Sequence, residues 1–341
     1  MNYDKPFKSF DELAHYLECE HGLNTSGTPE EYVHIADTLK IIPYYDLVNG
    51  YKDCFMENDI FRKEVHFDTL CLFHAFDRGL QNALFPFSII VEDYFKNILA
   101  YILARDFGVN VKDYLHPRNY ISNRGNLFYR KLHEKIERIY SNTSIDRIDE
   151  PTRHYVKVHN HIPPWILLKN ITFSNAINLF LLMKPAQKQE IANIMISGTF
   201  PVDQKIQILL YALTLIRKCR NRIAHNLKFI SFDASMYSKN INKKILHSWI
   251  PQDLLSKNDI QHDIGIHDIY GYIVFSLALI PDCLLKLLSI SRLTAYFSYY
   301  QGIPRLSEMW QNQIKIYSDV TKLPIDIASR LKKYQDTISI I

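Results

Sequence analysis

The sequence contains little glycine and no paired cysteine spacing. Only 10 of its 341 residues are glycine, below the usual share of about 7%, so few positions favour tight turns and the composition favours helices over strands. The cysteines are odd in number and never spaced Cys-x-x-Cys, which excludes a zinc knuckle and a disulfide framework. A reducing, cytoplasmic location is therefore expected. The cysteines are Cys19, Cys54, Cys71, Cys219 and Cys283.

Long apolar runs and an excess of charge are also missing. No basic segment followed by an apolar one stands at the N-terminus, so no secretory signal is expected. The longest apolar stretch, residues 271–290, is interrupted by Pro281, Asp282 and Lys286, which is typical of a buried core helix and not of a membrane span. The net charge of +4 excludes a polybasic binder, so a nucleic-acid contact is expected only as a local patch.

What is present is helical periodicity along most of the chain. Ser9 followed by Glu12 forms a capping box, and Thr28 followed by Pro29 marks a second helix start. We find no period-two strand pattern, so the predicted fold class is all-α, with long helices that form a bundle. The further helices are expected at residues 67–84, 88–107, 127–140, 165–183, 187–195, 202–229, 269–300 and 306–341.

The sequence suggests three parts. We expect an N-terminal helical subdomain over residues 1–62, a helical bundle over 63–300 and a C-terminal helical tail over 301–341. Within the bundle, residues 231–267 are rich in Ser, Asn, Asp and Lys, which is typical of a surface loop.

The most informative segment is residues 216–226, which place four cations, an amide and an imidazole at the end of one predicted helix. At 100° per residue, Arg217, Arg220, Asn221 and His225 share one broad face, and the amide of Asn221 is four residues before the imidazole of His225 and able to orient it. Arginine neutralises charge on a phosphate, and histidine exchanges protons near neutral pH. The cluster suits metal-independent RNA cleavage with the 2′-OH as nucleophile.

Spacing alone is a weak signal, because Arg147/His154 and Arg153/His159 match the same Arg and His pattern. Neither pair has an Asn after the Arg on a predicted helix. The third pair is Arg220 and His225. The alternative for it is that His225 complements the helix dipole while its basic neighbours are solvated.

The histidines near residue 160 are followed by no Cys or carboxylate at ligand spacing, so no metal or cofactor is expected.

The segment from Arg220 to His225 resembles the Arg-x4–6-His signature of HEPN ribonucleases, in which a polar residue commonly follows the Arg. The chain from about Lys5 to about Asn226 resembles one branch of them, the Abi-like abortive-infection proteins of the AbiD/AbiF type. One departure from that pattern is Pro43, in the Tyr-rich turn. The matching motifs are residues 5–10, 42–51, 67–80, 92–97 and 161–168.

This resemblance implies a HEPN-like bundle and a metal-independent endoribonuclease that acts as a toxin in phage defence. It implies a homodimer whose two Arg/His helices line one cleft, and a small noncoding RNA as a candidate antitoxin. Carried over to this sequence, His225 is the general acid or base, Arg220 the phosphate clamp and Asn221 an orienting residue. The alternative is a non-catalytic RNA-binding or regulatory module.

Several other side chains have expected roles. RNA phosphates away from the scissile bond are expected to contact a basic set of four side chains. We expect Trp165 to be a buried anchor at a helix start. Asp77-Arg78 and Glu92-Asp93 are expected to form ion pairs within the chain, and the alternative for them is an active-site role. Tyr44, Tyr45 and Tyr51 either pack between helices or stack on unpaired bases. The basic set is Arg217, Lys218, Arg222 and Lys228.

Overall fold

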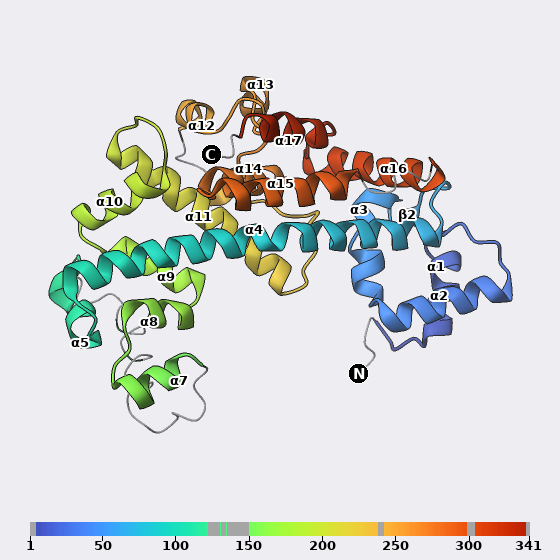
Figure 1. Ribbon diagram of the computed structural model, residues 1–341. Coiled ribbons are helices and arrows are strands. Elements are labelled where there is room, and N and C mark those ends of the chain that lie inside the picture. The colour runs from blue at the N-terminus through green and yellow to red at the C-terminus, as the bar shows by residue number, and fades with distance from the viewer. Residues whose placement is uncertain are drawn as a thin grey trace. The chain divides into compact units, whose positions relative to one another are not determined.

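The computed structural model describes residues 5–121, 130, 134, 150–237, 242–298 and 304–338. These residues are largely helical, and the only β-strands among them are the two-residue pair β1 (Met56–Glu57) and β2 (Ile60–Phe61), which is antiparallel (Figure 1). The predicted all-α fold is confirmed. None of the described helices combines the length and the apolar character that a membrane span requires. Apart from Arg130 and Glu134, the predicted helix at residues 127–140 lies outside the described residues.

The chain forms two compact units, each assembled from several stretches of sequence. The first unit contains residues 1–83, 222–232 and 293–328, and the second contains residues 84–221, 233–292 and 329–341. Each unit gathers segments that are distant in the chain. The sequence-based division at residues 62 and 300 stays a prediction.

Helices α4, α11, α15 and α17 have residues in both units. Their bounds are α4 Phe67–Phe107, α11 Val202–Ala224, α15 Cys283–Phe297 and α17 Ile327–Asp336. The other elements of the first unit are α1 Phe10–Cys19, α2 Pro29–Ile41, η1 Tyr45–Asn49, α3 Lys52–Phe55, β1, β2 and α16 Pro304–Thr321. The other elements of the second unit are α5 Val111–Tyr114, η2 Pro117–Asn119, α7 Thr152–His154, η4 Tyr155–His159, α8 Pro164–Asn170, α9 Phe173–Leu182, α10 Pro185–Met195, η5 Ser235–Tyr237, α12 Lys243–Trp249, α13 Lys257–Gln261 and α14 Ile269–Leu279.

Local capping sets the first two helix starts, as predicted. The Ser9 side chain accepts a hydrogen bond from the Glu12 amide while the Glu12 carboxylate accepts one from the Ser9 amide. The hydroxyl of Thr28 accepts from the Glu31 amide, and Pro29 stands at the first helical position. Each cap satisfies amides that a helix start leaves unpaired.

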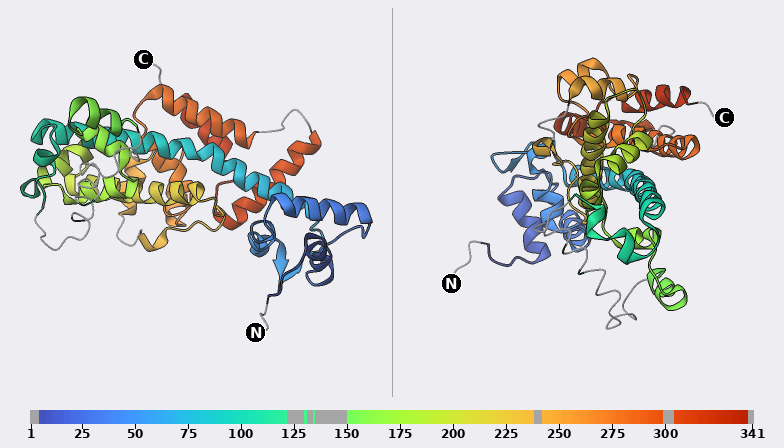
Figure 2. Two further views of the ribbon diagram at one scale, coloured as in Figure 1. Left: turned by 90° about the horizontal axis from the view of Figure 1, so that it is seen from below. Right: turned by 90° about the vertical axis from the view of Figure 1, so that its left-hand side faces the viewer.

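Helix α4 is one continuous helix, where the sequence predicts two helices separated near Pro86 (Figure 2). Proline lacks the amide donor and normally breaks a helix. Here the neighbouring side chains of Leu84, Phe87 and Ser88 are fully buried, and the Ser88 hydroxyl donates to the Phe85 carbonyl at 2.7 Å. Packing of these buried side chains keeps the helix continuous across the proline.

Other predicted helices are shorter than expected. The stretch 165–183 is divided into α8 and α9 because Thr172 starts a new helix by accepting from the Asn175 amide. The stretch 269–300 is divided into α14 and α15, which flank Pro281. The loop predicted at residues 231–267 contains α12 and α13, whose apolar side chains include the buried Leu246 and Ile260.

The second unit has an all-round buried helix at its core. Ten of the eleven residues of α14 are buried, as predicted for the apolar stretch from residue 271, and a helix that is apolar on every side belongs inside a protein. The Tyr272 hydroxyl donates to the Leu84 carbonyl at 2.7 Å.

Trp165 is 42% exposed, so the prediction that it is a buried anchor is wrong. Its neighbours Ile166 and Leu167 are buried there instead.

Candidate functional site

Helix α11 carries Arg220 and Asn221 on its last turns, and His225 follows its last residue. Its apolar face is buried in the protein, with Leu215, Ile216 and Cys219 at most 1% exposed. The polar residues of the final turns, Arg220 and Asn221 among them, are half-buried. The alternation of apolar and polar positions at helical spacing therefore presents this cationic face at the surface of the helix.

The helix ends in a left-handed cap that leaves His225 exposed. Asn226 has a φ of 55°, its amide donates to the Ile223 carbonyl at 3.0 Å, and the Leu227 amide donates to the Arg222 carbonyl at 3.0 Å. These two bonds form a Schellman motif, in which Asn is one of the residues that tolerate the left-handed conformation. The prediction that the helix continues to about residue 229 is wrong, because Asn226 ends it.

Arg220 lies beside a buried carboxylate. Its Nε is 3.6 Å from Oε2 of Glu92 on α4, and its Nη1 donates to Oδ1 of Asn221 at 3.3 Å. The Arg220 side chain is 33% exposed, whereas that of Glu92 is 9% exposed. The guanidinium is thus held at its inner end by an acid and remains open to solvent at its outer part.

Glu92 is itself fixed by a second buried cation. Lys96 Nζ lies 2.7 Å from Oε1 of Glu92, one helical turn away on α4. Lys96 also donates to the Ile171 carbonyl at 2.8 Å. Buried charges require partners inside the fold: Glu92 Oε1 pairs with Lys96, and Oε2 lies near Arg220 without a hydrogen bond among the described residues. The predicted ion pairing of Glu92 within the chain is confirmed.

Two further basic residues, Arg217 and Lys218, lie on the last turns of α11 within the second unit. Arg217 donates to the Ser174 hydroxyl of α9 at 3.4 Å, and Lys218 is half-buried. Asn221 accepts from Arg220, as described above, so its amide contacts the arginine of the candidate site.

Arg222 and Lys228 contact the segment that follows the helix and the Tyr-rich turn of the first unit. Arg222 donates to the Lys228 carbonyl and to the Ser231 hydroxyl. Lys228 donates to the Asn49 carbonyl at 3.1 Å, and its Nζ lies 4.9 Å from the ring centre of Tyr45. Both cations brace the fold, and their role in RNA binding stays a prediction.

Among the residues that the structure describes, Asp77 forms hydrogen bonds and not the expected ion pair. Its carboxylate, which is fully buried, accepts from the hydroxyls of Tyr317 at 2.8 Å and Tyr51 at 3.2 Å, and from the side chain of Gln81 at 3.0 Å. It also accepts from the Phe229 amide at 3.3 Å. Burial raises the pKa of Asp77, and these hydrogen bonds oppose the rise. The bond to Phe229 fixes the backbone that follows His225.

A small cavity lies at the C-terminal end of α11 within the first unit. Its volume is about 320 Å³, and its lining includes Ile223 and Asn226 together with His74 and Arg78 of α4. Burial, followed by the nearby Arg78 guanidinium, lowers the pKa of His74. An imidazole and a guanidinium therefore face a cavity that also reaches Asn226, the left-handed residue that ends the helix.

The boundary between the two units falls inside α11, after Asn221. Arg220 and Asn221 belong to the second unit with Glu92, and His225 belongs to the first unit. Arg220 and His225 are five positions apart in the chain, about 1.4 turns of an ideal helix. His225 directly follows the last helical residue, Ala224.

Sequence reasoning expected an ion pair at Glu92 of α4 but missed its partners, Lys96 and Arg220. Glu92 and Lys96 are spaced four residues apart among the buried positions Val91, Phe95 and Leu99. A charged pair at helical spacing within an apolar face is an available signal, because such charges require a partner inside the fold. The pairing of Glu92 with Arg220 depends on tertiary packing and has no local signature.

Comparison with protein families gives one match. The family described as Abi-like protein matches residues 37–231, more than half of the chain. The chain belongs to the Abi-like protein family. Comparisons with curated proteins and with solved structures find no match. Membership in this family indicates a role in abortive infection, which is a form of antiviral defence. The matched range includes Glu92, Arg220 and His225.

Proposed function

We propose that this Abi-like protein is a metal-independent endoribonuclease that acts as the toxin of an antiphage defence system. The observation that supports it best is the partly exposed Arg220 guanidinium, which is braced by buried Glu92 near the end of a helix whose capping residue is the exposed His225. The Arg, Asn and His at this helix end can supply the acid–base catalysis and charge stabilisation that transesterification of RNA uses.

The proposed reaction is attack of a ribose 2′-oxygen on the adjacent phosphorus. The 2′-O–P bond forms, the P–O5′ bond breaks, and the products carry a 2′,3′-cyclic phosphate and a 5′-hydroxyl. His225 takes the 2′-OH proton, and the leaving 5′-oxygen receives a proton either from the same imidazole or from His225 of the second copy, a pair of transfers for which an imidazole suits neutral pH. Arg220 neutralises the charge that develops on the phosphoryl oxygens.

Glu92 is proposed as a positioning residue for Arg220. A carboxylate that is 9% exposed and paired with Lys96 moves little, so it holds the guanidinium at Nε and leaves the outer nitrogens for the phosphate. Asn221 accepts a hydrogen bond from the same guanidinium and is proposed to orient Arg220. Sequence spacing assigns Asn221 a second role, orientation of the His225 ring.

The proposed active form is a homodimer restrained by an antitoxin, for which a small noncoding RNA is the proposed candidate. Arg220 and His225 lie about 140° apart around an ideal helix, so a second copy of α11 can supply the group that one copy directs away. Most soluble oligomers have such two-fold symmetry.

The test is cleavage of cellular RNA by the purified full chain in EDTA. Wild type is expected to cleave, and Arg220→Ala and His225→Ala are expected to lose at least 100-fold in rate, on the order of the contribution of general acid–base catalysis. His159→Ala removes another exposed histidine and is the matched control. Cleavage that persists in both active-site variants, or that requires a divalent metal, contradicts the proposal. RNA binding by wild type without cleavage identifies a non-catalytic module instead.

A further inference from the structure

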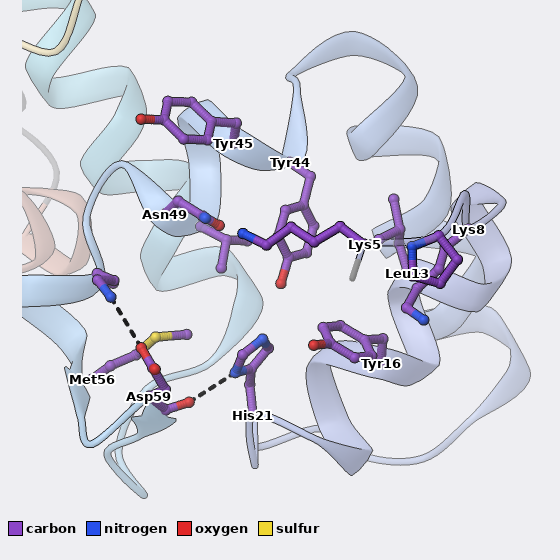
Figure 3. Close-up of a pocket in the computed structure, with 13 residues that line it drawn as sticks. Lys5, Lys8, Leu13, Tyr16, His21, Tyr44, Tyr45, Asn49, Met56 and Asp59 are labelled. Atoms are coloured by element: carbon purple, nitrogen blue, oxygen red, sulfur yellow. Dashed lines mark hydrogen bonds and ion pairs between the residues drawn. The ribbon is translucent and has the colours of Figure 1, made fainter. Parts of the chain in front are cut away.

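The first unit contains a second, larger pocket away from the end of α11. Its volume is about 570 Å³, within the roughly 300–1,000 Å³ of small-molecule sites. The pocket lies between α1, the Tyr-rich turn η1 and the β1–β2 hairpin (Figure 3). It is lined by Lys5, Pro6, Lys8, Leu13, Tyr16, His21, Tyr44, Tyr45, Val48, Asn49, Lys52, Met56 and Asp59.

Aromatic rings form one part of this pocket. Figure 3 shows the rings of Tyr16, His21 and Tyr44 arranged around the hollow. Tyr16 and His21 pack edge to face with their centroids 5.0 Å apart. Flat π-faces of this kind bind nucleobases without strong sequence preference.

The charge of the lining is positive. Asp59 is the only carboxylate among the described residues that line the pocket, and Lys52 Nζ neutralises it at 3.1 Å. Lys8 Nζ lies 4.8 Å from the centre of the Tyr16 ring, and Lys5 extends across the pocket near Tyr44 (Figure 3). The two lysines beside aromatic rings provide the positive charge that a phosphate requires.

Polar groups for a base edge are also present. The hydroxyl oxygen of Tyr44 is buried and has no hydrogen-bond partner among the described residues. Burial raises the pKa of Tyr44, so the hydroxyl stays protonated and able to donate. The side chain of Asn49 points into the pocket (Figure 3). A buried hydroxyl without a partner is unfavourable, and a ligand acceptor relieves this.

The pocket is connected to the segment that follows His225. Lys228 donates to the Asn49 carbonyl and lies over the Tyr45 ring, and both of those residues line the pocket. All these residues belong to the first unit, as does His225. A ligand in the pocket therefore binds to the same unit as the candidate general acid or base.

We propose that this pocket binds a nucleoside phosphate, supplied by an unpaired nucleotide of an RNA chain. The base lies against Tyr16 and Tyr44, and the phosphate lies at Lys5 and Lys8. The choice of RNA as the source rests on the proposed function, whereas the binding of a nucleoside phosphate does not.

The experiment measures binding to the full-length His225→Ala protein, in which cleavage is blocked. A labelled short single-stranded RNA is titrated by fluorescence anisotropy, the same RNA annealed to its complement is the paired arm, and AMP is titrated by calorimetry as the free-nucleotide arm. Tyr16→Leu keeps apolar volume and removes the ring, and Lys5→Ala removes the cation. Lys63→Ala and Tyr101→Leu, at exposed positions outside the pocket, are the matched controls.

The expected result is that Tyr16→Leu weakens single-stranded RNA binding about five-fold or more, the lower range for loss of one stacked base. Lys5→Ala is expected to reduce the slope of log K against log salt by about 0.7, the value for one phosphate contact on a single strand. The paired RNA binds more weakly than the single strand. Tyr45→Ala, at a side chain that is 64% exposed, provides a further variant that leaves the core intact.

Equal RNA affinity in the pocket variants and the controls overturns the proposal. AMP binding without binding of single-stranded RNA overturns RNA as the source. Cleavage by the wild-type chain is measured separately, so that a failure of the ribonuclease and a failure of the pocket are distinguishable. A protein that cleaves RNA while its pocket variants bind like the controls has the proposed activity without this site.

Discussion

Arg220 Nε lies 3.6 Å from Oε2 of Glu92, so a carboxylate of α4 sets the position of a cation of α11. The other oxygen of Glu92 is paired with Lys96, which in turn donates to a backbone carbonyl. The arginine of the candidate site is therefore the outermost member of a chain of charges that begins inside the second unit. Its position depends on packing between two helices as well as on the sequence of α11.

Removing the Glu92 carboxylate is expected to affect both stability and activity. Glu92→Ala leaves Lys96 buried without its partner and is expected to lower the free energy of unfolding by about 3–5 kcal/mol. The double variant Glu92→Leu, Lys96→Met removes both charges and is expected to recover most of that loss. Urea unfolding measures both variants.

The same double variant separates positioning from stability. It is expected to cleave RNA at least ten-fold more slowly than wild type, because Arg220 loses the acid that holds it. Wild-type cleavage by a stable double variant contradicts the proposed role of Glu92.

The left-handed cap at Asn226 is expected to tolerate glycine and to resist alanine. Asn226→Gly keeps the positive φ of 55° without strain, so the free energy of unfolding changes by less than about 0.5 kcal/mol. Asn226→Ala places a Cβ in the left-handed region and costs roughly 1–2 kcal/mol. Thermal unfolding of the two variants distinguishes them, and equal midpoints argue against this cap.

Asp77 is expected to be a structural centre of the first unit. Asp77→Ala removes the acceptor of two tyrosine hydroxyls, an amide side chain and the Phe229 backbone, which predicts a loss of more than about 3 kcal/mol. Tyr317→Phe removes one of these bonds and is expected to cost about 1 kcal/mol. Chemical unfolding tests both, and a neutral Asp77→Ala contradicts this assignment.

The stability of the chain is expected to contain a pH-dependent contribution from Asp268, which caps α14 in the second unit. The carboxylate accepts from the amides of Gly271 at 2.7 Å and Gly265 at 2.9 Å. Burial raises its pKa to about 6, while these bonds and nearby His267 oppose the rise. The folded state thus favours the protonated acid, and this contribution is fully present below about pH 4 and is lost as the pH rises to about 6.

The comparison with Asp268→Asn isolates that contribution. A shift of about two pKa units corresponds to roughly 3 kcal/mol, so wild type is expected to lose up to that amount relative to the variant between pH 4 and pH 6. The difference in free energy of unfolding between the two proteins is then constant above about pH 7. A difference that is flat over the whole range excludes the raised pKa.

The parts of the fold that local chemistry determines were predictable from the sequence. Ser9 and Thr28 cap their helices through residues three positions away, so the sequence around each start is sufficient. Residues 67–84 and 88–107 were expected to form two helices, yet α4 continues through Pro86 between them, because buried neighbours offset the lost hydrogen bond. Trp165 was expected to be buried, but it is exposed, because burial depends on tertiary packing that the local sequence does not determine.

The candidate site likewise has one part that the sequence predicts and one part that only the folded structure shows. The cations, amide and imidazole at the end of α11 follow from helical spacing in one short segment. The end of the helix at Asn226 was missed, because Asn tolerates both helical and left-handed backbone and only the hydrogen bonds of the cap decide between them. The pairing of Arg220 with Glu92 joins residues that are distant in the chain, so it requires the tertiary fold.

The central claim is tested most directly by the ends of the RNA that the purified chain produces in EDTA. The account predicts fragments that carry 2′,3′-cyclic phosphate and 5′-hydroxyl ends with wild type, and intact RNA with His225→Ala, whose thermal unfolding matches wild type because the residue is exposed. Fragments with 5′-phosphate and 3′-hydroxyl ends, or the same cyclic ends from His225→Ala, would contradict it.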